Sequence, residues 1–185
     1  LKMKNLIKSI ILLLFISAVG LQAQEPYRRG TTSANFLEIG YGAAGNSMGD
    51  AYVSMVNDIS SVYWNPAGLA LMEKNEAMFT YQPWFADITT SLASAGIVVD
   101  GIGTLALSLT TVNYGEMDVT TLAMQDGTGE KFSANDVAIG LSFGRKLAEW
   151  FSFGATAKYV SSSIWHTSAQ AMVIDLGVLI NTEFF

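Results

Sequence analysis

The sequence predicts an all-β fold: part of an antiparallel transmembrane β-barrel, about six strands, preceded by a glycine-rich hatch that contains a short helix. Half of the 185 residues are hydrophobic and only 14% are charged, whereas a soluble domain carries about 25% charged residues. After residue 20 no apolar run reaches the roughly 18 residues that a membrane-spanning helix needs. From residue 76 onward, large apolar residues alternate with small or polar ones, as in strands that face lipid on one side and a lumen on the other.

The first 23 residues have the form of a secretory signal peptide. Lysines at the start precede the apolar segment Ile10–Val19, and Ala23 offers a small residue at the exit. A membrane-anchoring helix is the alternative for this segment. Residues 24–35 are polar, and we expect them to form a flexible leader.

Charge and cysteine content exclude several classes of protein. The formal charge is -6, and removal of residues 1–23 takes three lysines with it, which leaves 7 basic against 16 acidic residues, or -9. Nucleic acid is therefore excluded as a partner, because phosphate binding needs clustered cations. The absence of cysteine excludes disulfides, thiolate metal sites and a lipoprotein anchor.

Residues 36–75 form a glycine-rich segment that can thread a confined space and then turn sharply; the family resemblance given below implies that this segment is a hatch. Small residues are dense near its start, and we expect a short helix at 51–59 that ends at Asn57 and Asp58. In the following turn, Pro66 fixes its own φ and keeps Asn65 extended, and a glycine two residues later permits a positive φ. The turn either gates a passage or simply packs the plug. The candidate hatch and gate residues are Gly45, Gly49, Asp58, Asn65, Pro66, Ala67 and Gly68.

Residues 76–185 contain the period-two pattern. Asp100-Gly101 marks a tight turn, and long polar loops are expected at 113–135 and 162–169, facing away from the cell. Lys158 and Asp175 are predicted to face the lumen, where they can form an ion pair. The six predicted strands are Glu76–Gln82, Thr90–Val99, Gly103–Val112, Asp136–Lys146, Phe151–Ser161 and Ala171–Thr182.

Aromatic residues lie near the ends of these strands, as in the girdles of membrane barrels. They are Trp84, Phe85, Trp150, Phe151, Tyr159 and Trp165. Ordinary packing in a soluble core is the alternative.

The glycine-rich run from Gly40, the pair Asn57-Asp58 and the segment Tyr63–Leu69, in that order, resemble the hatch of the PorV/PorQ family within the FadL-like outer-membrane barrels. The resemblance covers residue 36 to the end. It implies an outer-membrane location and a barrel of about fourteen strands, of which residues 76–185 are the N-terminal part of a truncated or longer chain. Gly68 stands where PorV hatches tend to carry a lysine, which favours the lipid-transport branch.

The resemblance implies either transport of hydrophobic compounds or support of type IX protein secretion. The implied partners are outer-membrane lipid and either hydrophobic small molecules or secretion-system proteins. No catalytic or metal-binding group is predicted, because His166 is the sole histidine, so we expect a protein that is not an enzyme and holds no cofactor. The alternative is a secreted soluble β-sandwich that acts in binding or adhesion.

Overall fold

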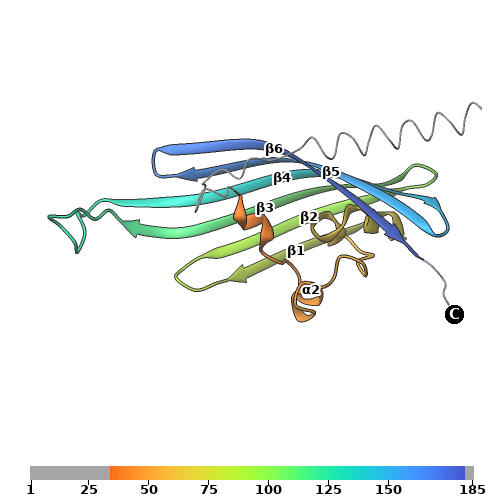
Figure 1. Ribbon diagram of the computed structural model, residues 1–185, viewed down its shortest axis with the longest axis horizontal. Helices are drawn as coiled ribbons and strands as arrows, with labels where there is room; N and C mark the ends of the chain where they lie inside the picture. The colour runs from red at the N-terminus through yellow and green to blue at the C-terminus, as the bar shows by residue number, and fades with distance from the viewer. Residues whose placement is uncertain (1–33, 182–185) are drawn as a thin grey trace, which may run out of the picture. The chain divides into compact units, whose positions relative to one another are not determined.

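The computed structural model describes residues 34–181, and the predicted signal peptide lies outside them, with most of the leader. The described residues form one six-stranded antiparallel sheet in which each strand pairs with the next along the chain (Figure 1). The strands are β1 (Glu76–Pro83), β2 (Thr89–Val99), β3 (Gly103–Asp118), β4 (Lys131–Ala148), β5 (Phe151–Ile164) and β6 (Thr167–Ile180). All six predicted strands are therefore confirmed.

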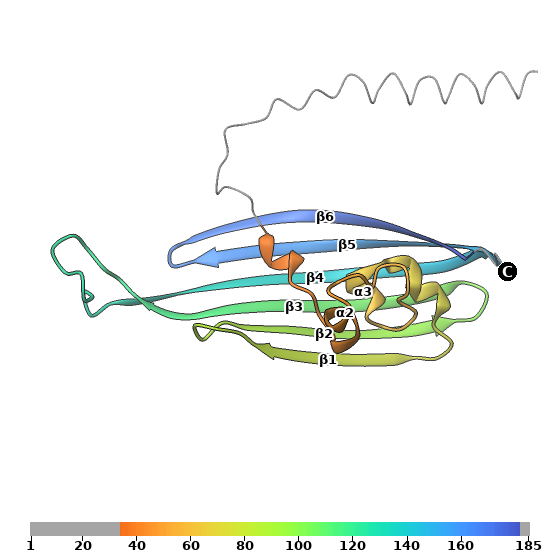
Figure 2. The ribbon, with the colours of Figure 1, turned by 60° about the horizontal axis from the view of Figure 1, so that its bottom comes forward.

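Both predicted loops are shorter than expected. Within the segment 113–135, residues 113–118 and 131–135 are strand and only 119–130 form a loop. β3 and β4 stay paired from Glu116↔Ser133 to Asp118↔Lys131, beyond a bulge that follows Asn113. Their hairpin extends further than the others in both ribbon views (Figures 1 and 2). The segment 162–169 is also a paired hairpin, whose turn is only Trp165 and His166. Backbone pairing continues where the apolar alternation stops. A prediction from the alternation alone therefore placed the ends of these strands too early.

One face of the sheet is apolar and exposed. Alternate residues of β6 from Met172 to Ile180 are 53–77% exposed, and Leu107 of β3 is 60% exposed. The apolar positions from Met172 to Ile180 extend over nine residues, at the lower end of the roughly 9–11 residues with which a tilted β-strand crosses a membrane. In the described part of the chain no second sheet covers this face. Separately, no helix among residues 34–181 has the length and apolarity needed to cross a membrane.

The opposite face carries small residues, and the hatch packs on it (Figure 2). The hatch consists of η1 (Asn35–Glu38), α2 (Ala43–Ser47), α3 (Ser61–Trp64) and η2 (Pro66–Leu71). The helix expected at 51–59 is absent: this segment forms turns and the helices lie on either side of it. Gly49 and Asp50 have φ of 62° and 66°. These left-handed conformations end α2 and stop a right-handed helix from continuing.

Candidate functional site

Three glycines form a smooth strip across the inner face of the sheet. Gly144 of β4 is the register partner of Gly154 in β5, and Gly154 is the register partner of Gly177 in β6. The three residues, here called the glycine track, therefore lie side by side on adjacent strands. A strip without side chains lets another segment of backbone approach the sheet closely.

The turn from Asn65 to Leu69 lies directly on the glycine track. A Cβ atom at Gly144 would lie 2.7 Å from Leu69 Cβ and 2.8 Å from the Pro66 carbonyl oxygen. A Cβ at Gly154 would overlap the backbone between Pro66 and Ala67. Ala67 and Leu69 are fully buried. The glycine track is thus the place where the predicted hatch turn contacts the sheet.

Asn65 joins three parts of the chain. Its φ of -162° and ψ of 109° are extended, as predicted for a residue before proline. Its Oδ1 accepts a hydrogen bond from the Ala67 N–H at 3.0 Å and so caps η2. Its Nδ2 donates to the carbonyl oxygens of Val53, at 3.1 Å, and Val178, at 3.2 Å. One amide therefore starts the turn and ties the hatch to β6.

The predicted glycines of the hatch serve different purposes. Gly68 is not in the left-handed region, which corrects the expectation of a positive φ. It is required for space, because a Cβ there would lie 2.5 Å from the Val56 carbonyl oxygen. Gly45 lies under the ring of Trp64, which a Cβ would overlap, whereas Gly49 has open space and a left-handed φ.

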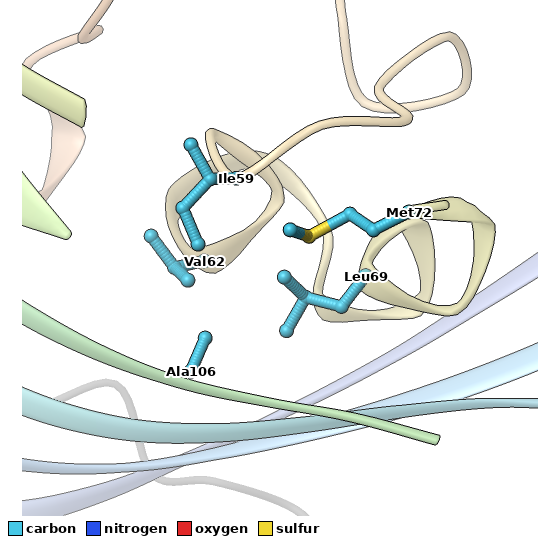
Figure 3. Packing of buried hydrophobic residues seen from close by; sticks show 5 residues of the cluster. All are labelled: Ile59, Val62, Leu69, Met72 and Ala106. Carbon is cyan, nitrogen blue, oxygen red and sulfur yellow. The ribbon is translucent and has the colours of Figure 1, made fainter. Parts of the chain in front are cut away.

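Apolar side chains hold the second half of the hatch on the sheet. Ile59, Val62, Leu69 and Met72 are at most 6% exposed and pack with Ala106 of β3. Figure 3 shows these side chains converging above the strand. Burying each of the four hatch side chains contributes about 1.5–3 kcal/mol, so hydrophobic packing is the main force that docks this part.

Aromatic rings connect the two halves of the hatch. Trp64 contacts Tyr63 and Tyr52 edge to face, with ring centroids 4.9 and 6.0 Å apart, and its Nε1 donates to the Tyr41 carbonyl oxygen at 3.0 Å. The Tyr63 hydroxyl donates to the Leu37 carbonyl oxygen at 3.1 Å. Burial, with smaller effects of nearby ionisable groups, raises the pKa of Tyr63 far above its usual value. The phenol therefore stays neutral and keeps its role as donor.

Asp58 begins a helix and does not end one. Its Oδ1 accepts a hydrogen bond from the Ser60 N–H at 2.9 Å and also from the Ser60 hydroxyl. The neighbouring Ile59 N–H donates to Glu76 Oε2 at 3.1 Å, which links the start of α3 to β1. Asp58 thus serves the backbone of the hatch itself.

The pair Lys158 and Asp175 lies on the hatch side of β5 and β6. Lys158 Nζ is 2.6 Å from Asp175 Oδ2, and the side chains are 14% and 37% exposed. The predicted ion pair is therefore present. Both residues line a pocket of about 550 Å³ that Asn65 and Pro66 also border.

Sequence reasoning missed the glycine track and the link from Glu76 to α3. Small inward residues were visible along each strand, but their alignment across strands depends on register, which a single strand does not reveal. Within residues 34–181 there is no cluster of three or more histidine, cysteine or acidic residues that could hold a metal ion.

Together these features define a β-sheet protein with an exposed apolar face and a hatch docked on its small-residue face. The chain belongs to the PorV family: residues 22–175 match the family described as "Type IX secretion system protein PorV". The matching family is the one described as a secretion system protein, whereas Gly68 favoured the lipid-transport branch in the sequence. No curated protein matches the chain.

Proposed function

We propose that the protein is an outer-membrane β-barrel component of type IX secretion, to which residues 76–181 contribute part of the wall. The observation that carries this proposal is the division of the sheet into two faces. The apolar face is exposed over about as many residues as a strand needs to cross a membrane, while the other face receives the hatch. A soluble sandwich would instead pack its bulky face inward.

Aromatic residues at the strand ends support the same arrangement. Trp84 and Phe85 lie in the β1–β2 turn and Trp165 in the β5–β6 turn, at one end of the sheet, and Trp150 lies in the β4–β5 turn at the other. Each is 52–74% exposed. Such rings favour membrane–water interfaces. The long β3–β4 hairpin lies at the first end, which we assign to the outside of the cell because outer loops of barrels are the longer ones.

In this proposal the protein acts without catalysis. The hatch occupies the lumen and blocks free diffusion, and secretion-system proteins are the partners. The side chains of Lys158 and Asp175 then line the lumen next to the hatch turn. The surrounding outer-membrane lipid contacts the apolar face.

Transport of hydrophobic compounds is the second candidate, and one pocket favours it. At the outward end of the sheet lies a largely apolar pocket of about 550 Å³. Its apolar lining includes Ile88, Met117, Ala134 and Ile164, and the carboxylate residues Glu116 and Asp136 and four serine or threonine residues also border it. A pocket of this size and character suits an apolar ligand.

Two measurements test the proposal. Expressed in a cell that secretes through the type IX pathway, the protein should fractionate with the outer membrane and change its gel mobility on boiling. Deletion of its gene should retain type IX cargo inside the cell, and complementation should restore export. Recovery of the protein in the soluble periplasm would refute the barrel. Normal cargo export with loss of uptake of a hydrophobic compound would favour transport over secretion.

A further inference from the structure

The hatch has two parts that differ in how they are held. The second part, residues 59–72, lies on the glycine track and contributes the buried hatch side chains of the apolar cluster. The first part, residues 42–50, here called the arm, carries α2 and is exposed at every residue except Gly42, which is partly buried, and Gly45, which is buried. Packing therefore restrains the second part of the hatch more than it restrains the arm.

The turn at Asn65–Gly68 has no freedom to act as a hinge. A Cβ at Gly68 would meet the Val56 carbonyl oxygen at 2.5 Å, so this glycine is packed against backbone. The turn lies on Gly154, and Asn65 is held by three hydrogen bonds to two other segments and its own turn. Close packing of backbone on backbone resists small displacements.

The arm, in contrast, is bounded by backbone suited to a hinge. Gly42 has φ of 93° at one end, and Gly49 and Asp50 have φ of 62° and 66° at the other. A Cβ on either glycine would meet nothing within 4 Å, so both ends have open space. The arm's main contact with the anchored part is Gly45 under the ring of Trp64. Short hinges next to rigid elements are where loop motions concentrate.

We propose that the Asn65–Gly68 turn is the fixed anchor of the hatch, and that opening is a motion of the arm about Gly42 and Gly49–Asp50 while the anchor stays on the glycine track. This inference rests on the proposed function, in which the hatch blocks the lumen, and adds to it that the hatch opens during export. It assigns the predicted gate residues to two roles: Asn65, Pro66, Ala67 and Gly68 hold the hatch, and Gly45 and Gly49 belong to the part that moves.

The chain contains no cysteine, so two engineered disulfides can separate these roles. The anchor staple is N65C/G177C, because a Cβ at position 177 contacts the Asn65 side chain. The arm staple is G40C/N46C, which ties α2 of the arm to a residue outside the arm. A Cβ at position 40 would lie 2.7 Å from Asn46 Oδ1, which is two bonds from the Asn46 Cβ, so the two Cβ atoms can reach the range of a disulfide.

Each stapled protein is tested for export of type IX cargo in cells, oxidised and then reduced. Because N65C removes the amide that holds the turn and G177C adds a side chain to the glycine track, each stapled protein is compared with its own reduced form. Oxidation should leave export by the anchor-staple protein unchanged, whereas it should stop export by the arm-staple protein until reductant restores it. Loss of export with the anchor staple, or full export with a completely formed arm staple, would overturn the proposal. If the protein without engineered cysteines does not restore export either, the proposed function is wrong. The division into anchor and arm is then tested by hydrogen exchange alone.

Hydrogen exchange of the unmodified protein in outer-membrane preparations gives that independent answer. The Gly68 N–H, bonded to the Asn65 carbonyl oxygen, should exchange at least about tenfold more slowly than the Gly49 N–H, bonded to Asn46. Equal rates in the two parts would refute the division into anchor and arm.

Discussion

Replacing Gly154 with alanine tests whether the glycine track holds the hatch. The new methyl group would overlap the carbonyl carbon and oxygen of Pro66 and the nitrogen of Ala67, all of which are backbone atoms. A flexible side chain could move aside, but backbone on a strand and in a capped turn cannot do so cheaply. Overpacking of this kind costs about 1–3 kcal/mol.

This cost is smaller than the free energy that docks the hatch. Four buried side chains at about 1.5–3 kcal/mol each give about 6–12 kcal/mol as an upper estimate. The Gly154→Ala protein should therefore keep its hatch docked on average but release it more often. A loss of about 1–3 kcal/mol corresponds to about a 5–150-fold rise in the open population.

Hydrogen exchange with mass spectrometry measures that rise directly, because amides of η2 exchange through hatch release. The matched control is Gly140→Ala, also an inward glycine of the sheet, where the new Cβ would meet the Ser108 hydroxyl oxygen, at the end of a movable side chain, at 2.5 Å. Unchanged exchange in Gly154→Ala, or an equal rise in the control, would refute the role of the track.

Three other changes probe the remaining contacts. Asn65→Asp keeps the oxygen that caps η2 but removes the donor to two carbonyl groups, so hatch release measured by exchange should become easier by about 1–3 kcal/mol; no change would show that the link to β6 is dispensable. Lys158→Met should lower the temperature of heat-induced mobility change more than the double variant Lys158→Met/Asp175→Leu, because it leaves a carboxylate without its partner; an equal or smaller effect would argue against a coupled pair. Burial raises the pKa of Tyr63, so the phenol ionises at a lower pH when the hatch is released than when it is docked. Hatch docking should be at full strength below the usual tyrosine pKa of about 10 and weaken above it by at most about 1.4 kcal/mol per pH unit. The same alkaline loss of docking in Tyr63→Phe would assign the loss to another group.

The strands were predictable because each carries its own signal. Alternation of large and small residues depends only on the local chain, and it located all six strands. It failed at the outer ends of β3 and β4, where Glu116, Asp118 and Lys131 are paired strand residues although their side chains are charged. Backbone hydrogen bonds form there without an apolar face, so a pattern of side chains cannot mark the end of pairing.

The hatch was harder to predict because its short helices depend on contacts distant in sequence. Asp58 was expected to end a helix and instead starts one, since Ser60 supplies its partners. Gly68 was expected to permit a positive φ, but its φ is not positive, and glycine is required there because Val56 leaves no room for a side chain. The extended conformation of Asn65 was predicted correctly, because proline imposes it locally.

The alignment of Gly144, Gly154 and Gly177 also has a consequence for assembly. If β6 slipped by one residue along β5, a bulky neighbour of Gly177, either Leu176 or Val178, would arrive beneath the turn and every side chain of β6 would change face. The hatch can therefore dock on the sheet only when β5 and β6 pair in this one register. Errors in the pairing of β5 and β6 would therefore leave the hatch without its seat on the sheet.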